Sequence, residues 1–369
     1  MTRVLTSAIA MAAALALSSG TALASPTDPA PASSSATAAR DTVFAATDHL
    51  AAQVASALTD REVRNRAVTA TASAPADLVA LTANTNLAQA ALKANQAVLA
   101  AKGLPADSGS LLQLRVATDA MHAALSRGEV PLVAAAPTDD EVASITAYDP
   151  LGGKVTLDPV VAPTRPVLVV EVDVAKALPK GIDLMRKTLA RSGVTEAKPL
   201  ATVQSAGGYW ATKINAVRLS DDEEPWIKGA AEIYSIVGGF GLDGKAAVNI
   251  VQMPYLDHDD TTYYPNQLLV HFNGYKYNLA DVVMMEDDGD TNYQQLARTI
   301  ITALLTIADA GTYIPLVDPI ISAIPTSWWT DDPDYVDSWY TLSTSSRGRV
   351  NGARGNGWMD VEPYWVSEL

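Results

Sequence analysis

Hydrophobic and polar residues alternate over short runs in the second half of the chain, which is the pattern of half-buried β-strands. Turn-forming glycine, asparagine and clustered acidic residues separate these runs, so we expect an antiparallel β-sandwich. The pair Asn273-Gly274 predicts a hairpin turn. Helical spacing from Tyr293 onward predicts a helical insertion into the sandwich. The expected strands cover residues 212–219, 232–237, 247–251, 267–272 and 338–342.

The first half of the chain has a different pattern, in which alanine is abundant and apolar residues recur at helical spacing. We expect helices over residues 41–58, 76–101 and 110–126. A small α/β segment follows, with a hairpin over 142–157, a buried strand over 166–174 and a helix over 180–191. The strand and the helix are not joined by a glycine-rich phosphate-binding sequence, so a nucleotide site is not expected there. The fold class predicted for the whole chain is α+β.

The first 24 residues have the features of a secretory signal peptide. Arg3 supplies the basic start, an apolar stretch follows, and Ala22-Leu23-Ala24 has the small residues that signal peptidase accepts. We therefore expect cleavage after Ala24 and a secreted protein, either extracellular or periplasmic. Residues 25–40, rich in proline, alanine and serine, are predicted to form a disordered linker. No later segment is apolar and long enough to predict a transmembrane helix.

Charge and aromatic content divide the chain at one place. Residues 1–219 hold 18 acidic and 19 basic residues, whereas residues 220–369 hold 23 acidic and 7 basic residues. Only Phe44 and Tyr148 of the aromatic residues precede position 209. We therefore predict one region over 41–205 and an acidic, aromatic-rich domain over 206–369. The net charge of −15 argues against a nucleic-acid partner, and the absence of cysteine excludes disulfides and thiolate chemistry.

Clusters of carboxylates lie at the ends of several expected strands, at 221–224, 257–260, 286–290 and 331–337. Alternate strand ends of a sandwich meet at one edge, so the clusters are expected to converge and to repel one another. A divalent cation relieves this repulsion, and calcium suits irregular loops rich in aspartate. Two alternatives remain open: a solvated acidic surface and a catalytic pair of carboxylates.

Three stretches of the second half resemble a family of secreted bacterial proteins known as domain of unknown function 3103. They begin SDDEEPWIKG, YPNQLLVHFNG and TDDPDYVDSW. Their acidic loops are also similar to those of C2-like β-sandwiches, which hold calcium at one edge. This second resemblance implies metal ligands in three loops. The implied ligands are Asp221, Asp222 and Glu224; Glu286, Asp287 and Asp288; and Asp331, Asp332 and Asp334.

The sequence contains no recognisable catalytic motif. Trp328 and Trp329 are adjacent in a polar segment, which makes them the candidates for exposed, ligand-binding aromatics. We therefore expect a calcium-stabilised binding module for a surface, matrix or polysaccharide partner. The alternatives are a secreted hydrolase that uses carboxylates and a purely structural extracellular protein.

Overall fold

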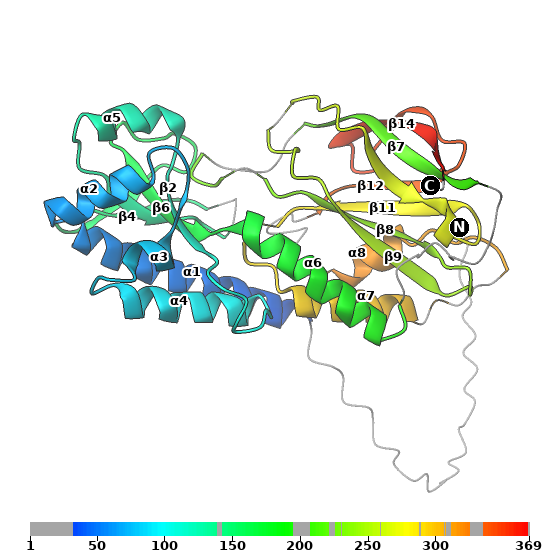
Figure 1. Ribbon diagram of the computed structural model, residues 1–369, viewed down its shortest axis with the longest axis horizontal. Helices are drawn as coiled ribbons and strands as arrows, with labels where there is room; N and C mark the ends of the chain where they lie inside the picture. The colour runs from blue at the N-terminus through cyan, green and yellow to red at the C-terminus, as the bar shows by residue number, and fades with distance from the viewer. Residues whose placement is uncertain are drawn as a thin grey trace, which may run out of the picture. The chain divides into compact units, whose positions relative to one another are not determined.

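In the residues that the structure describes, the strands form one six-stranded and two four-stranded sheets (Figure 1). The structure is a computed structural model. It describes residues 32–138, 142–194, 207–220, 226–229, 231–258, 260–287, 289–305, 307, 311–324 and 335–367. Its helices and mostly antiparallel sheets confirm the predicted α+β class.

The six-stranded sheet belongs to the first half of the chain. Its central strand β6 (Val167–Val172) is buried at every residue, as its run of branched apolar side chains predicts. The strand β6 pairs antiparallel with β2 (Leu112–Val116) and parallel with β3 (Leu132–Ala135). The other strands are β1 (Ala76–Asp77), β4 (Ile145–Tyr148) and β5 (Lys154–Leu157), in the order β1-β2-β6-β3-β4-β5.

Helices pack against this sheet because their apolar faces need a partner. The long helix α1 (Ala32–Ala57) contacts β3 and β6 and lies beside α4 (Ala88–Ala101) (Figure 1). The helix α6 (Val174–Arg191) begins directly after β6, where the Asp173 side chain accepts a hydrogen bond from the Lys176 backbone N–H. Shorter helices are α2 (Arg61–Ala70), α3 (Leu78–Thr82) and α5 (His122–Ser126).

The two four-stranded sheets belong to the second half and are antiparallel throughout. One has the order β10-β7-β14-β13, and the other has the order β12-β11-β8-β9. Buried side chains of both, among them Val217 and Val282, form one hydrophobic cluster, so the sheets share a core. The strands are β7 (Gly208–Leu219), β8 (Tyr234–Phe240), β9 (Ala246–Gln252), β10 (Gln267–His271), β11 (Leu279–Met285), β12 (Tyr335–Ser343), β13 (Gly348–Asn351) and β14 (Gly357–Ser367).

Two helices lie between β11 and β12 in the chain, at the place of the expected helical insertion. These are α7 (Tyr293–Leu305) and α8 (Val317–Ala323). The helix α7 packs on α6 and α8 packs on β11. One hydrophobic cluster therefore includes residues from both halves, such as Ile182 and Ile300. The unit Ala32–Leu369 is compact. The predicted boundary between residues 205 and 206 lies outside the described residues.

Several local predictions were wrong. Residues 110–126 form strand β2 and the short helix α5 instead of one helix, because alternate residues Leu112, Leu114 and Val116 are buried in the sheet. Residues 32–40 are helical instead of belonging to a disordered linker, since α1 begins at Ala32. The turn at Asn273-Gly274 does not join a hairpin, because β10 pairs with β7 while β11 pairs with β8 and β12.

Across the part of the chain that the structure describes, no helix combines the length and apolar character needed to cross a membrane.

Candidate functional site

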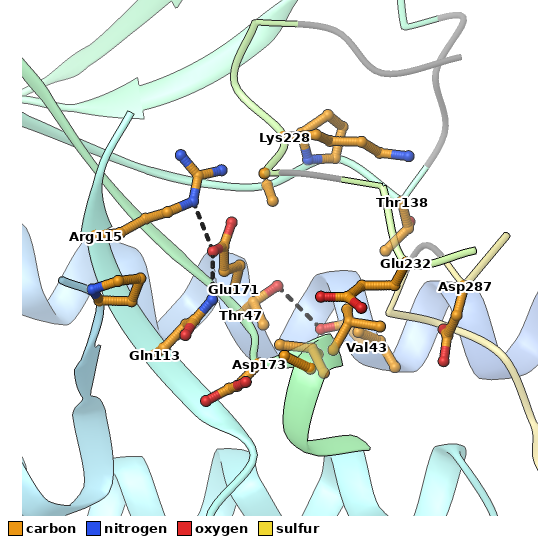
Figure 2. Close-up of a pocket in the computed structure, with 17 residues that line it drawn as sticks. Val43, Thr47, Gln113, Arg115, Thr138, Glu171, Asp173, Lys228, Glu232 and Asp287 are labelled. Carbon is orange, nitrogen blue, oxygen red and sulfur yellow. Dashed lines mark hydrogen bonds and ion pairs between the residues drawn. The ribbon is translucent and has the colours of Figure 1, made fainter. Parts of the chain in front are cut away.

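A pocket of about 270 Å³ lies beside the six-stranded sheet and the segment that precedes β8 (Figure 2). The strands β2 and β6 supply one side, and residues 228–232 supply another. Most of the titratable side chains in its lining are carboxylates. The charged and amide side chains of the lining are Gln113, Arg115, Glu171, Asp173, Lys228, Glu232 and Asp287.

Three of these side chains form a network on neighbouring strands. Gln113 on β2 is directly opposite Glu171 on β6. Arg115 Nε and Gln113 Nε2 each donate to Glu171 Oε1 over 2.7 Å. Arg115 also donates through Nη2 to the Ile227 carbonyl over 2.5 Å. The network therefore pairs the charge of Glu171 and fixes the 226–229 segment against the sheet.

Asp287 belongs to a second, fully buried network. Its Oδ1 accepts from Lys102 Nζ over 3.3 Å and from the Gly289 backbone N–H over 2.9 Å. Tyr293 donates its hydroxyl to Oδ2 of the same carboxylate. The Lys102 and Asp287 side chains are both 0% exposed, and Lys102 Nζ lies 4.8 Å from the centre of the Tyr293 ring. These contacts join the end of α4 to the start of α7.

Asp173 is also paired with a cation. Its Oδ2 lies 2.7 Å from Lys176 Nζ, one turn further along α6. This carboxylate therefore serves as the helix cap and as the partner of a nearby lysine. Its charge still acts on the pocket, because Asp173 is part of the lining.

Glu232 differs from the other carboxyl groups of the pocket. It is half-buried, and among the described residues its carboxyl has no hydrogen-bond or ion-pair partner. Burial raises the pKa of Glu232 to about 7, with further contributions from the negative charges of Asp287, Asp173 and Asp257. Figure 2 shows this carboxyl among the side chains of the lining, between Lys228 and Asp173. Near neutral pH the group therefore exists in both protonation states, so it can donate a hydrogen bond or accept one.

Most of the predicted metal ligands cannot be placed. Asp288, all the residues predicted in the 221–224 and 331–334 loops, and Trp328 and Trp329 lie outside the described residues. Glu286 and Asp287 are described and buried. Within the described ranges, no three Asp, Glu or His side chains are grouped so that they could hold a metal ion. The calcium site accordingly stays a prediction, and Asp287 has Lys102 as its cationic partner.

The pocket residues were not predicted from the sequence, although one signal was present. Glu171 is a single charge inside the apolar run VLVVEV, and a charged residue there needs a buried partner. The partner of Glu171 is Arg115, which is 56 residues away in the sequence. The sequence around these two residues does not indicate that they form an ion pair.

The fold and the pocket together define an α+β protein with a carboxylate-lined site. The family model described as protein of unknown function (DUF3103) matches residues 45–368. The chain belongs to this family, which confirms the resemblance to it that the three stretches of the second half indicate. No curated protein and no solved structure matches the chain.

Proposed function

We propose that this protein binds one unit of a hydroxyl-rich ligand in the pocket, such as a sugar of a surface or matrix polysaccharide. The observation that carries this proposal is Glu232, a half-buried carboxyl without a described partner in a lining where Arg115 and Asp287 are already paired. A polar group that is partly removed from water is stabilised by a ligand that hydrogen-bonds to it. Among the side chains of the lining, a hydrogen bond from a ligand should therefore stabilise Glu232 the most.

The size and the chemistry of the pocket limit the ligand. A volume of about 270 Å³ is at the small end for ligand sites, which favours a single small ring over a larger molecule. Sugar hydroxyls both donate and accept hydrogen bonds, as does a carboxyl group whose pKa is about 7. Thr138 and Gln113 add further polar atoms to the same lining. An anionic ligand is disfavoured by the surrounding carboxylates.

The proposal predicts a ligand-dependent shift of the melting temperature. The probes are glucose, galactose, mannose and N-acetylglucosamine, each added at 50 mM. For a sugar that binds with a Kd of about 0.5 mM, this concentration is on the order of 100 times the Kd. The sugar that binds most tightly should then stabilise the protein by about 2.7 kcal/mol. Glu232→Leu should reduce this shift by more than half, because an alkyl side chain can neither donate nor accept a hydrogen bond. The matched control is Glu129→Leu, which changes a surface carboxylate outside the pocket. Equal shifts in both variants, or no shift with any sugar, would contradict the proposal.

A hydrolase is the second candidate, and the raised pKa of Glu232 is the observation that favours it. A carboxylic acid that is still protonated near neutral pH can give its proton to a leaving group. Release of sugars from glycans in the same samples would assign catalysis in place of binding. Such release should fall as the pH rises through about 7, because the acid then loses its proton, and Glu232→Gln should abolish it.

We also propose that the protein binds calcium at its acidic loops and that the two four-stranded sheets have a C2-like arrangement. We further propose that the protein is secreted after cleavage at Ala24. If the loops at 221–224 and 331–334 converge, calcium binds the native state and relieves the repulsion of their carboxylates. Millimolar calcium should then raise the melting temperature by a few degrees, and EDTA should reverse the change. Asp222→Asn combined with Asp332→Asn should remove the response. Identical melting curves in calcium and in EDTA would contradict this part.

A further inference from the structure

A second concave surface lies in the segment that connects β9 to β10. We name it the tyrosine groove. It has a volume of about 530 Å³ and is lined by Pro254, Tyr255, Tyr263, Tyr264, Pro265 and Gln267. Tyr264 is 73% exposed, so its ring is accessible to a ligand that packs on aromatic side chains.

The other two tyrosines of the groove are held in place by their hydroxyls. Tyr255 donates to Gln267 Oε1 over 2.5 Å, and Tyr263 donates to Asp257 Oδ1 over 2.6 Å. Gln267 in turn donates through Nε2 to the Gln252 carbonyl over 2.8 Å. The rings of Tyr255 and Tyr263 lie 6.1 Å apart at 47°. The groove is therefore a preformed aromatic surface with an amide and a carboxylate at its edge.

We propose that the tyrosine groove binds further units of an uncharged, linear polysaccharide whose first unit occupies the pocket with Glu232. This inference rests on the proposed function, and it names the class of ligand as a polymer of neutral hexose rings. The apolar faces of such rings pack on aromatic side chains, while their hydroxyls can donate to the carboxylate of Asp257.

A backbone contact brings the two sites together. The Met253 backbone N–H donates to the Ile233 carbonyl over 2.8 Å. Ile233 directly follows Glu232 of the pocket, and Pro254 of the groove directly follows Met253. Asp257, whose carboxylate accepts the hydroxyl of Tyr263, lies on the same segment as Pro254. A chain of several sugar units can therefore extend from the pocket to the groove.

The committed hydroxyls and the charge of the groove favour a polysaccharide over other polymers. A proline-rich peptide also packs on aromatic grooves, but its carbonyls need donors, and the hydroxyls of Tyr255 and Tyr263 already donate within the protein. Acidic polysaccharides are disfavoured because Asp257 and the net charge of −15 would repel them. A neutral sugar chain is not repelled by Asp257, and its own hydroxyls can act as hydrogen-bond donors.

Binding of saccharides of increasing length tests the inference. The probes are the four monosaccharides named above and linear, uncharged hexasaccharides built from the same hexoses, titrated by calorimetry against the full chain. At least one hexasaccharide should bind about tenfold more tightly than its monosaccharide, and Tyr264→Ala should remove this gain while monosaccharide binding stays unchanged. The control is Tyr364→Ala, which removes another exposed tyrosine, on β14 outside the groove.

The outcomes separate this inference from the proposed function. Equal affinity for the hexasaccharide and the monosaccharide would overturn the groove as a sugar site and leave the pocket proposal standing. If Tyr264→Ala weakens hexasaccharide binding but Glu232→Leu changes nothing, the groove stands as a sugar site and the pocket proposal fails. Tyr264-dependent binding of a polyproline peptide, with no binding of any saccharide, would overturn both.

Discussion

Replacing Asp287 with alanine should lower the free energy of unfolding by about 3–5 kcal/mol, because it leaves the charge of Lys102 buried without a partner. The Lys102 side chain is 0% exposed and its ammonium group donates to Asp287 over 3.3 Å. Tyr293 loses the acceptor of its hydroxyl in the same variant. Urea unfolding at neutral pH measures the change.

Two further variants make this test specific. Asp183→Ala removes an ion pair with Lys187 whose side chains are both 61% exposed, and it should cost less than about 1 kcal/mol. The double variant Lys102→Met with Asp287→Leu should recover much of the loss, because no charge then remains buried. If Asp287→Ala and Asp183→Ala have the same small effect, Lys102 is not a buried charge in solution.

Replacing Asp337 with alanine should be similarly severe, with a loss of at least about 3 kcal/mol. The side chain of Asp337, at the start of β12, is fully buried and accepts from three backbone N–H groups at 2.8 Å. These donors are the backbone amides of Ser338, Arg354 and Gly357, and alanine would leave them without this acceptor. Asp360→Ala, which changes a half-buried aspartate on β14, should cost much less.

Gly352, which lies close to Asp337 in space, gives an independent test of the enclosure of the Asp337 carboxylate. A Cβ atom added at Gly352 would overlap the Asp337 carboxylate, so Gly352→Ala should also destabilise the protein strongly. Gly229→Ala is the matched control, since its new Cβ would meet only the Arg115 side chain, at 3.8 Å. Wild-type stability of Gly352→Ala in urea would mean that the 352–357 loop does not enclose this carboxylate.

The hydrophobic pattern correctly predicted those helices and strands whose structure is determined by their local sequence. The run VLVVEV is a buried strand wherever it finds two neighbours, and it forms β6. The pattern failed where tertiary pairing decides. Leu111 and Leu114 have helical spacing, whereas Leu112 and Leu114 have the spacing of a strand, and pairing of residues 112–116 with β6 selects the strand.

The candidate site was less predictable than the fold, for a physical reason. Acidic clusters look alike in the sequence whether they bind metal, face water or meet a buried cation. Asp287 belongs to the cluster 286–290, yet its partner Lys102 is 185 residues earlier. Glu232 is separated from the nearest acidic cluster, and its raised pKa arises from burial and from charges at positions 287, 173 and 257. No local spacing rule contains such information.

The long separation between Lys102 and Asp287 also determines when the pocket can form during folding. The Lys102 ammonium group loses its hydration only when the Asp287 carboxylate binds to it. Closing the long loop between the two residues costs conformational entropy before this contact forms. The six-stranded sheet is complete by residue 172, so it can assemble while the end of α4 is still hydrated. The pocket is therefore a late product of the whole chain, and a fragment that stops before residue 287 lacks it.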